Sequence, residues 1–156
     1  MSDLGFHGDF KDIMGLLKDR LGINNAILRK LDGDELKTIA YFGYGENEAM
    51  MKIMVGQGVT GLCAKEKKNI VINDLEHYAG MYLSGIDGAK SELCIPLLLS
   101  GRLIGTLNIE SIEKSNFSKE KIDLAVRIAQ MLVHSVADLG NKTGRHLART
   151  LALLEK

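Results

Sequence analysis

The sequence predicts an α+β domain with an antiparallel sheet and long helices at both ends. Two hairpin signals predict the sheet, because Asp32-Gly33 and Ser100-Gly101 each join two strand-like runs by a tight turn, and strands joined in this way must be antiparallel. Helical periodicity, with apolar residues at steps of three and four, occurs near the two ends of the chain. The 17 glycines and one proline in 156 residues indicate many tight turns.

The first half of the chain opens with a helix over residues 3–21, which Gly22 ends. Strands at 26–31 and 35–42 follow, and the Asp32-Gly33 dipeptide between them predicts a type I′ turn. Residues 43–90 contain eight glycines and read as a long shaped loop region with a strand at 69–72 and two short helices. The helix presents one apolar stripe of Phe6, Phe10, Ile13, Leu17 and Leu21.

The second half begins with strands at 91–99 and 102–110. Strict alternation in the latter strand places one set of side chains against helices and the other toward a cavity or water. The first set is Leu103, Leu107 and Ile109, and the second is Ile104, Thr106, Asn108 and Glu110.

A long helix then begins after Ser118, a good N-cap residue, and runs to Leu139. Gly140 and Gly144 either end or weaken it, and residues 140–156 carry a further leucine stripe without a partner in the core. We therefore expect one domain over residues 1–139 and a helical tail or linker stub over 140–156. No internal repeat or interdomain linker is evident.

Composition excludes several classes of function. Twenty basic and 20 acidic residues cancel, so the chain has no global field to attract nucleic acid or an anionic membrane, and we expect neither as a partner. No apolar stretch approaches the roughly 20 residues that cross a bilayer, and the start lacks the pattern of a signal peptide. With only two cysteines, Cys63 and Cys94, we expect a cytoplasmic location.

The motifs assign no metal, cofactor or catalytic group. Residues 56–61 spell GxGxxG, but a dinucleotide site needs parallel βαβ units, and a P-loop needs Lys and Ser/Thr where Leu62-Cys63 stand. Cys63 and Cys94 lack histidines at zinc-site spacing and read as buried small hydrophobes. All four tyrosines lie outside the long helices, where they either pack in a core or line a ligand cavity: Tyr41, Tyr44, Tyr78 and Tyr82.

Several short blocks in this order resemble the GAF domain family, a group of cytoplasmic sensor modules. The resemblance covers about residues 6–139. It implies an α+β fold of GAF/PAS type, with a six-stranded antiparallel sheet, helices on one face and a ligand pocket under loops on the other. The blocks are VGQGVTG at 55–61, INDL at 72–75, SELCIPL at 91–97, GTLNIES at 105–111, and Phe117.

Within that family the chain is similar to the free methionine-R-sulfoxide reductases, but it lacks their cysteines. The three cysteine positions of those enzymes fall on Met50, Thr60 and Gly85, and a hydroxyl cannot replace a thiolate nucleophile. Their acidic substrate-binding positions fall on Glu92, Asn108 and Glu110, which implies a polar pocket without the chemistry. In cyclic-nucleotide GAF domains a lysine follows the asparagine and pairs with acidic residues after the phenylalanine. Here these positions are Ile109 and Lys121-Ile122, so that salt bridge cannot form, which argues against cyclic-nucleotide sensing without excluding it.

We therefore expect a non-enzymatic sensor that binds an unidentified small polar or amphipathic molecule. The domain would relay binding through a helical homodimer interface, with a possible output domain in a larger signalling protein. The helix residue Val133 and three tail leucines would meet the second chain. The expected ligand-binding residues are Thr60, Tyr78, Tyr82, Glu92, Asn108 and Glu110.

Two alternatives from other classes stay open. One is a ligand-free dimerisation module whose pocket is filled by Tyr78, Met81 and Tyr82. The other is a thiol-dependent redox enzyme of methionine sulfoxide reductase type that uses Cys63 and Cys94.

Overall fold

The computed structural model describes residues 2–83 and 85–139, with side chains for residues 10, 12–83 and 85–139. The predicted tail, residues 140–156, lies outside the described residues. The elements in chain order are α1 (Ser2–Leu21), β1 (Ala26–Asp32), β2 (Glu35–Phe42), α2 (Glu46–Ala49), β3 (Ile53–Met54), α3 (Gly58–Glu66), β4 (Ile70–Ile72), a 3₁₀ turn (Leu75–His77), β5 (Ser91–Leu99), β6 (Arg102–Ser111) and α4 (Lys119–Leu139).

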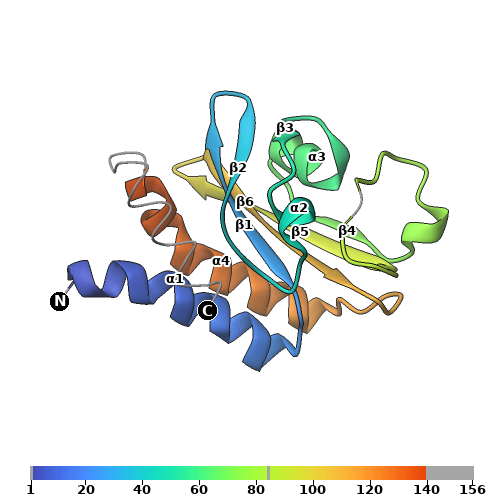
Figure 1. Ribbon diagram of the computed structural model, residues 1–156, viewed down its shortest axis with the longest axis horizontal. Coiled ribbons are helices and arrows are strands. Elements are labelled where there is room, and N and C mark those ends of the chain that lie inside the picture. The colour runs from blue at the N-terminus through green and yellow to red at the C-terminus, as the bar shows by residue number, and fades with distance from the viewer. Residues whose placement is uncertain (1, 84, 140–156) are drawn as a thin grey trace.

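The strands form one six-stranded sheet in the order β3-β2-β1-β6-β5-β4, with every neighbouring pair antiparallel. The long helices α1 and α4 pack against each other along one face of this sheet, and α2 and α3 lie on the other side (Figure 1). The expected α+β fold and its division into a helix face and a loop face are thus confirmed.

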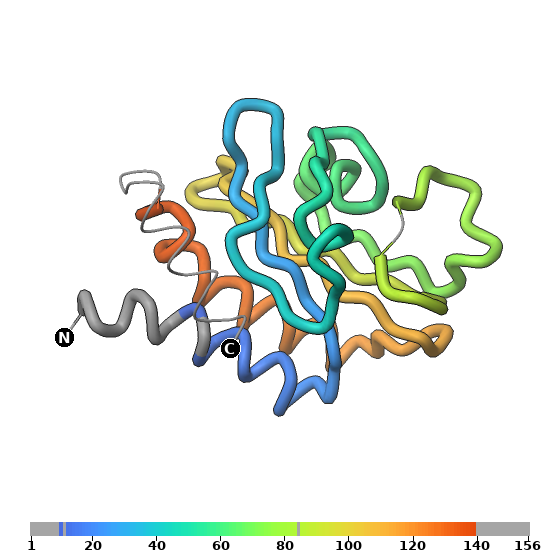
Figure 2. The backbone as a smooth tube through the Cα atoms, in the orientation of Figure 1, coloured from blue at the N-terminus to red at the C-terminus, as the bar shows by residue number. Residues whose placement is uncertain are grey.

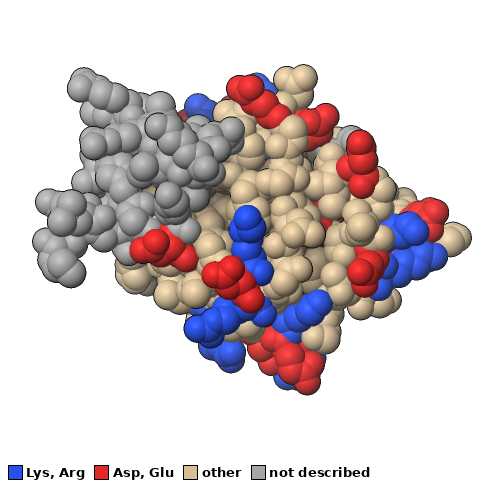
Figure 3. All heavy atoms as spheres, turned by 60° about the horizontal axis from the view of Figure 1, so that its bottom comes forward, with Lys and Arg blue, Asp and Glu red and all other residues tan. Residues whose placement is uncertain are grey.

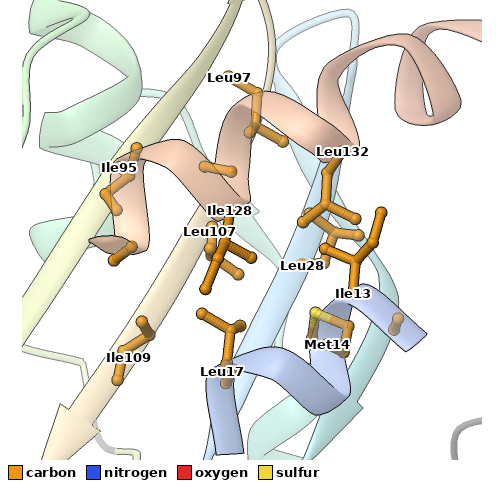
Figure 4. Close-up of a cluster of buried hydrophobic side chains, with 14 of the residues drawn as sticks. Ile13, Met14, Leu17, Leu28, Ile95, Leu97, Leu107, Ile109, Ile128 and Leu132 are labelled. Carbon is orange, nitrogen blue, oxygen red and sulfur yellow. The ribbon is translucent and has the colours of Figure 1, made fainter. Parts of the chain in front are cut away.

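The main core lies between the two long helices and the sheet. Side chains from α1, α4 and the central strands point toward one another there, among them Met14, Leu28, Leu107 and Leu132 (Figure 4). Ser118 begins α4 as expected, because its hydroxyl oxygen accepts a hydrogen bond from the Lys121 N–H at 3.2 Å. Truncating a buried leucine of this core to alanine would cost about 2–5 kcal/mol.

One expectation for α4 is wrong. Val133 was expected on the outer surface, facing a second chain, but it is 7% exposed and belongs to the main core. The stripe on α4 is wide enough for both Leu132 and Val133 to face inward, since buried positions at spacings of one, three and four share the inner side of a helix. Met131 is the exposed apolar residue on this part of the helix, at 53%.

The two hairpin turns differ in type. In the β5–β6 turn Ser100 (φ +53°) and Gly101 (φ +79°) both have positive φ, as a type I′ turn requires. In the β1–β2 hairpin Asp32 pairs with Glu35, so the turn is centred on Gly33-Asp34. Of those two only Gly33 has a positive φ, +64°, and the predicted type I′ turn is therefore wrong there.

A β-bulge in β6 overturns the predicted alternation at the start of that strand. Leu97 pairs with Gly105 and Leu98 pairs with Leu103, so Ile104 is an extra residue. One extra residue moves the following side chains to the opposite face. As a result Leu103 packs beside α3 on the loop face, and Ile104 joins the helix-side core. A side chain at Gly105 would overlap the carbonyl oxygen of Arg29 on the neighbouring strand.

The glycine-rich stretch after β2 folds over the loop face of the sheet (Figure 2). Its GxGxxG motif forms the turn that begins α3, in which Gly56 has φ +96°. A Cβ at Gly61 would lie 2.9 Å from the Gly56 nitrogen, so the backbone passes too closely for a larger residue. The motif is therefore a structural turn.

The opposite side of the molecule carries charges of both signs, with Lys and Arg among Asp and Glu (Figure 3). Within residues 2–83 and 85–139, none of the helices combines the length and apolar character that crossing a bilayer requires.

Candidate functional site

Polar side chains are buried on the loop face of the sheet, although buried side chains are usually apolar. Glu92 on β5 pairs with Glu110 on β6, and Asn108 on β6 lies between Cys94 on β5 and Ile27 on β1. All three polar side chains point away from the main core, because their alternating neighbours, such as Leu93 and Ile109, fill it.

These side chains border a small cavity. It has a volume of about 20 Å³, and its polar wall consists of Arg29, Tyr44, Glu48, Thr60, Glu92, Asn108 and Glu110. Such a volume holds about one water molecule. The cavity as it stands is thus too small for a metabolite.

Glu110 is the most highly connected group of the wall. Its carboxylate accepts hydrogen bonds from the Tyr82 hydroxyl at 2.6 Å and from the Ile86 N–H at 3.2 Å. The Asn25 side chain binds its backbone, donating to the carbonyl at 2.7 Å and accepting from the N–H at 2.8 Å. Tyr44 in turn donates to Asn25 Oδ1 at 3.0 Å. These bonds tie the loops on both sides of the cavity to β6.

Burial controls the ionisation of the two glutamates. It raises the pKa of Glu92 well above its ordinary value, and the charge of Glu110 raises that pKa further. Burial also raises the pKa of Glu110, although the hydrogen bond from Tyr82 opposes the shift. Of two neighbouring carboxyl groups of this kind, having one protonated is more favourable than having both ionised.

Arg29 is the unexpected member of the site. It is 3% exposed, and it belongs to none of the ion pairs formed by the described residues. Its Nε and Nη1 are buried without a hydrogen-bond partner, as are Glu92 Oε1, Asn108 Oδ1 and Thr106 Oγ1. Burial lowers the pKa of Arg29, but a guanidinium starts so high that it stays charged at neutral pH. A buried cation without a direct partner is costly, so this arrangement is incomplete by itself.

The structure brings most of the predicted site residues together. Thr60, Glu92, Asn108 and Glu110 border the one cavity, and Tyr82 reaches it through its bond to Glu110. Tyr78 instead packs in the neighbouring cluster of Val59, Cys63 and Cys94.

Sequence reasoning missed Arg29 and Asn25 as members of the site, and it named Tyr44 only among four tyrosines that either pack in a core or line a ligand cavity. Arg29 precedes Lys30 near a hairpin end, which is typical of solvent-exposed strand residues. Its position among the apolar residues of β1 was the available sign of burial. The Asn25 contacts join residues 85 positions apart, and no local pattern predicts them.

The two cysteines lie beside the cavity wall but do not border it. Both are fully buried and free. Burial raises the pKa of the Cys94 thiol well above its ordinary value, and the neighbouring Cys63 raises it further. In the part of the chain that the structure describes, no three His, Cys, Asp or Glu side chains form a group that could hold a metal ion.

The comparison with protein families decides the classification. A family model described as "GAF domain" matches residues 10–133. The chain belongs to the GAF domain family. A curated relative, "GAF domain-containing protein A" of Dictyostelium discoideum, is 27% identical over 84 residues, which is 54% of this chain and 52% of that protein. The match therefore spans about half the length of that relative.

Two kinds of protein with solved structures have the same fold as this chain. A type II free methionine-R-sulfoxide reductase from Thermoplasma acidophilum has a TM-score of 0.77 and 22% identity, over 85% of this chain and 93% of that chain. The GAF domain of an Acinetobacter phosphoenolpyruvate-protein phosphotransferase also has a TM-score of 0.77, with 16% identity over 89% of this chain and 86% of that chain. At these identities the likeness shows the fold alone, which a reductase and the GAF domain of a phosphotransferase have in common.

Proposed function

We propose that this GAF domain is a non-enzymatic sensory module that binds a small polar metabolite in the cavity between Thr60, Glu92, Asn108 and Glu110. The observation that supports it most is the set of buried polar atoms without partners around that cavity. Native proteins leave few such atoms, because each costs about 1–3 kcal/mol. A polar ligand would supply the missing hydrogen bonds.

The chemistry of the cavity argues for binding without turnover. Thr60 borders the cavity at one of the positions where the similar reductases carry a cysteine, and a threonine hydroxyl is a poor nucleophile for a sulfoxide. The thiols that the chain does have, Cys63 and Cys94, are fully buried. Reactive cysteines need exposure and a lowered pKa, and burial raises that of Cys94.

The helix side offers a surface for transmitting the binding event. A groove of about 500 Å³ lies between α1 and α4, with Leu16, Leu124 and Met131 in its wall and Arg20 and Arg127 beside them. Methionine and arginine are enriched at protein interfaces, and the leucines add apolar surface that a partner can cover. We propose that two copies associate here as a parallel homodimer, because a helix can change position only relative to a partner against which it packs.

The ligand-free dimerisation module stays the second candidate because the cavity is so small. A volume of about 20 Å³ admits no metabolite until the wall moves. The particular filling expected for this alternative is wrong, however, because Met81 is 59% exposed and does not enter the cavity. The Tyr82 hydroxyl donates a hydrogen bond to Glu110 at the edge of the cavity, and Tyr78 packs against the cluster of Val59, Cys63 and Cys94.

Native mass spectrometry of the freshly purified full chain tests the proposal. We expect a co-purified small molecule that leaves on denaturation and that is absent from a Glu92→Ala, Asn108→Ala double variant. The protein should also be inactive on free methionine-R-sulfoxide in the presence of dithiothreitol. A mass equal to that of the bare chain, together with no thermal shift from a metabolite library, would favour the ligand-free module.

A further inference from the structure

The buried guanidinium of Arg29 is the feature that the proposed function leaves unexplained. Arg29 is 3% exposed, its Nε and Nη1 have no hydrogen-bond partner, and it takes part in none of the ion pairs among the described residues. The cost of removing a charge from water is recovered only by a close partner of opposite charge. A counter-charge from outside the chain would recover it here.

The sheet register keeps the glutamates of the cavity away from Arg29. β1 and β6 are the two central strands of the sheet, and Arg29 pairs with Thr106 on β6 (Figure 1). Glu110 lies four residues further along β6, so at about 4.8 Å per strand and about 3.3 Å per residue its Cα is roughly 14 Å from that of Arg29. The Tyr82 hydroxyl also holds the Glu110 carboxylate in place. Glu92, which pairs with Glu110, lies one strand further away.

The cavity that Arg29 borders has room for one small particle. Its volume of about 20 Å³ holds about one water, which is too little for a carboxylate, a phosphate or another polyatomic anion. A water would accept hydrogen bonds from Arg29 but would leave the charge unbalanced, whereas a monatomic anion does both. The attraction between opposite charges is strengthened by an apolar wall, and much of this wall is apolar. Its apolar members are Ile27, Met51, Ile53, Val59 and Leu83.

We propose that Arg29 binds a halide ion, such as chloride, which accepts charge-assisted hydrogen bonds from its Nε–H and Nη1–H. The site goes beyond the proposed function and does not depend on it. The halide is held from β1 and fits the cavity as it stands, whereas a metabolite requires the wall to move.

Two acceptors that border the same cavity, Asn108 Oδ1 and Glu92 Oε1, have no hydrogen-bond partner and would repel an anion. They satisfy each other when Glu92 is protonated, and burial raises the pKa of Glu92 in favour of that proton. The Asn108 amide already forms a hydrogen bond with Glu92. Turning this amide by 180° lets Oδ1 accept from the protonated carboxyl group and leaves Nδ2 as a further donor for the halide.

Halide binding is therefore coupled to a proton on Glu92. Affinity should be highest at low pH and should fall as the pH rises through the folded-state pKa of Glu92, because the ionised carboxylate repels the anion. In Glu92→Gln, which cannot ionise, this fall should be absent or weaker. The ionisable groups that face Arg29 or border the cavity are Glu92 and Cys94 from β5, Glu110 from β6, Tyr44 after β2 and Glu48 on α2.

Crystals of the full chain soaked in sodium bromide test the site directly, because bromide scatters anomalously. We expect an anomalous peak in contact with Nε or Nη1 of Arg29. Thermal unfolding of the full chain in sodium chloride, compared with equal concentrations of sodium gluconate, measures the affinity, since gluconate is too large for the cavity. Chloride should raise the unfolding temperature in a saturable manner, by about 3–6 °C at a tenfold excess over the dissociation constant. The rise should be larger at pH 6 than at pH 9.

Variants locate the effect. Arg29→Met should still fold, because it removes a buried charge without a partner, and it should lose the chloride-dependent rise. Arg29→Lys keeps the charge and should retain part of the rise. Lys30→Met is the matched control, because Lys30 is the next residue on the same strand but does not border the cavity, and it should respond to chloride like the wild type.

The contrary outcomes are distinct. Bromide peaks only at the surface, equal unfolding temperatures in chloride and gluconate, or a chloride effect that persists in Arg29→Met would each refute the halide site. An effect of equal size at pH 6 and pH 9 in the wild type would refute the coupling to Glu92. All these results leave the sensory function standing, because that function is tested by the co-purified molecule. An empty chain in native mass spectrometry, conversely, leaves the halide site standing.

Discussion

Glu92 and Glu110 are paired directly across β5 and β6, and both are almost completely buried on the face of the sheet opposite α1 and α4. Acidic side chains in direct cross-strand register repel each other when both are ionised. Glu110 has two hydrogen-bond donors at its carboxylate, whereas Glu92 Oε1 has none. The pair is therefore unequal, and Glu92 is the member that gains more from protonation.

The first prediction concerns stability and pH. Burial and the charge of Glu110 raise the pKa of Glu92 above its ordinary value of 4.5, so the folded protein binds a proton more tightly than the unfolded chain. The free energy of unfolding should accordingly fall as pH rises from about 4.5 through the folded-state pKa. Glu92→Gln cannot ionise, and the fall should be weaker in this variant. Above that range the variant should be more stable than wild type by about 1–3 kcal/mol.

Urea unfolding between pH 5 and pH 9 measures this effect. Glu113→Gln, a change of the same type at an exposed position, serves as the control and should follow the wild-type curve. Parallel curves for wild type and Glu92→Gln would contradict the expected ionisation of Glu92.

The second prediction concerns the asparagine that binds the backbone of Glu110. Asn25→Ala removes both bonds to that backbone and the acceptor of the Tyr44 hydroxyl, leaving buried polar groups unpaired. We expect a loss of about 2–4 kcal/mol in the free energy of unfolding. Asn24→Ala, a change at the exposed neighbouring side chain, should cost less than about 0.5 kcal/mol. Chemical denaturation of the two variants in parallel gives the comparison, and equal losses would refute the role of Asn25.

The third prediction separates packing from chemistry at the cysteines. Cys63→Ser and Cys94→Ser each replace a fully buried sulfur by a hydroxyl, which should cost about 1–3 kcal/mol of stability. Ligand binding should change little, because neither side chain borders the cavity. The measurements are denaturation, ligand titration, and an assay with free methionine-R-sulfoxide and dithiothreitol. Thiol-dependent turnover that either substitution abolishes would favour the redox enzyme instead.

Local patterns in the sequence were sufficient for most of the fold. Alternation and turn residues located β5 and β6, and the 3.6-residue period located α1 and α4, because each depends on neighbouring residues. The bulge at Ile104 was not predictable in this way, since it depends on how closely Gly105 approaches the Arg29 carbonyl on another strand.

The candidate site was likewise predictable where it depends on local pattern and not where it depends on tertiary contacts. Asn108 and Glu110 were placed on the loop face by alternation, and resemblance to a family added Thr60 and Glu92. Arg29 was missed because a basic residue in a strand is normally exposed, and its burial here results from the loops that cover β1. A residue that departs from its usual environment is visible only once the tertiary structure is known, and such departures concentrate at functional sites.

The last prediction concerns assembly. Met131 in the groove between α1 and α4 is 53% exposed and lies beside Leu124, whereas Val133 is buried in the main core. A second copy of the helix pair would cover these apolar side chains, and placing a charge among them should prevent it. We therefore expect the full chain to be a dimer at micromolar concentration and Met131→Glu to raise the dissociation constant at least about tenfold.

Sedimentation equilibrium measures this dissociation constant directly. Ile112→Glu is the matched control, because Ile112 is 61% exposed but lies outside α1 and α4, and its variant should dimerise like the wild type. A wild-type chain that stays monomeric at all accessible concentrations would reject the dimer. A chain truncated after Leu139 then locates the interface, because a dimer that persists without residues 140–156 must be held by α1 and α4. If truncation abolishes the dimer while Met131→Glu leaves it unchanged, the tail forms the interface and the groove on the helix pair does not.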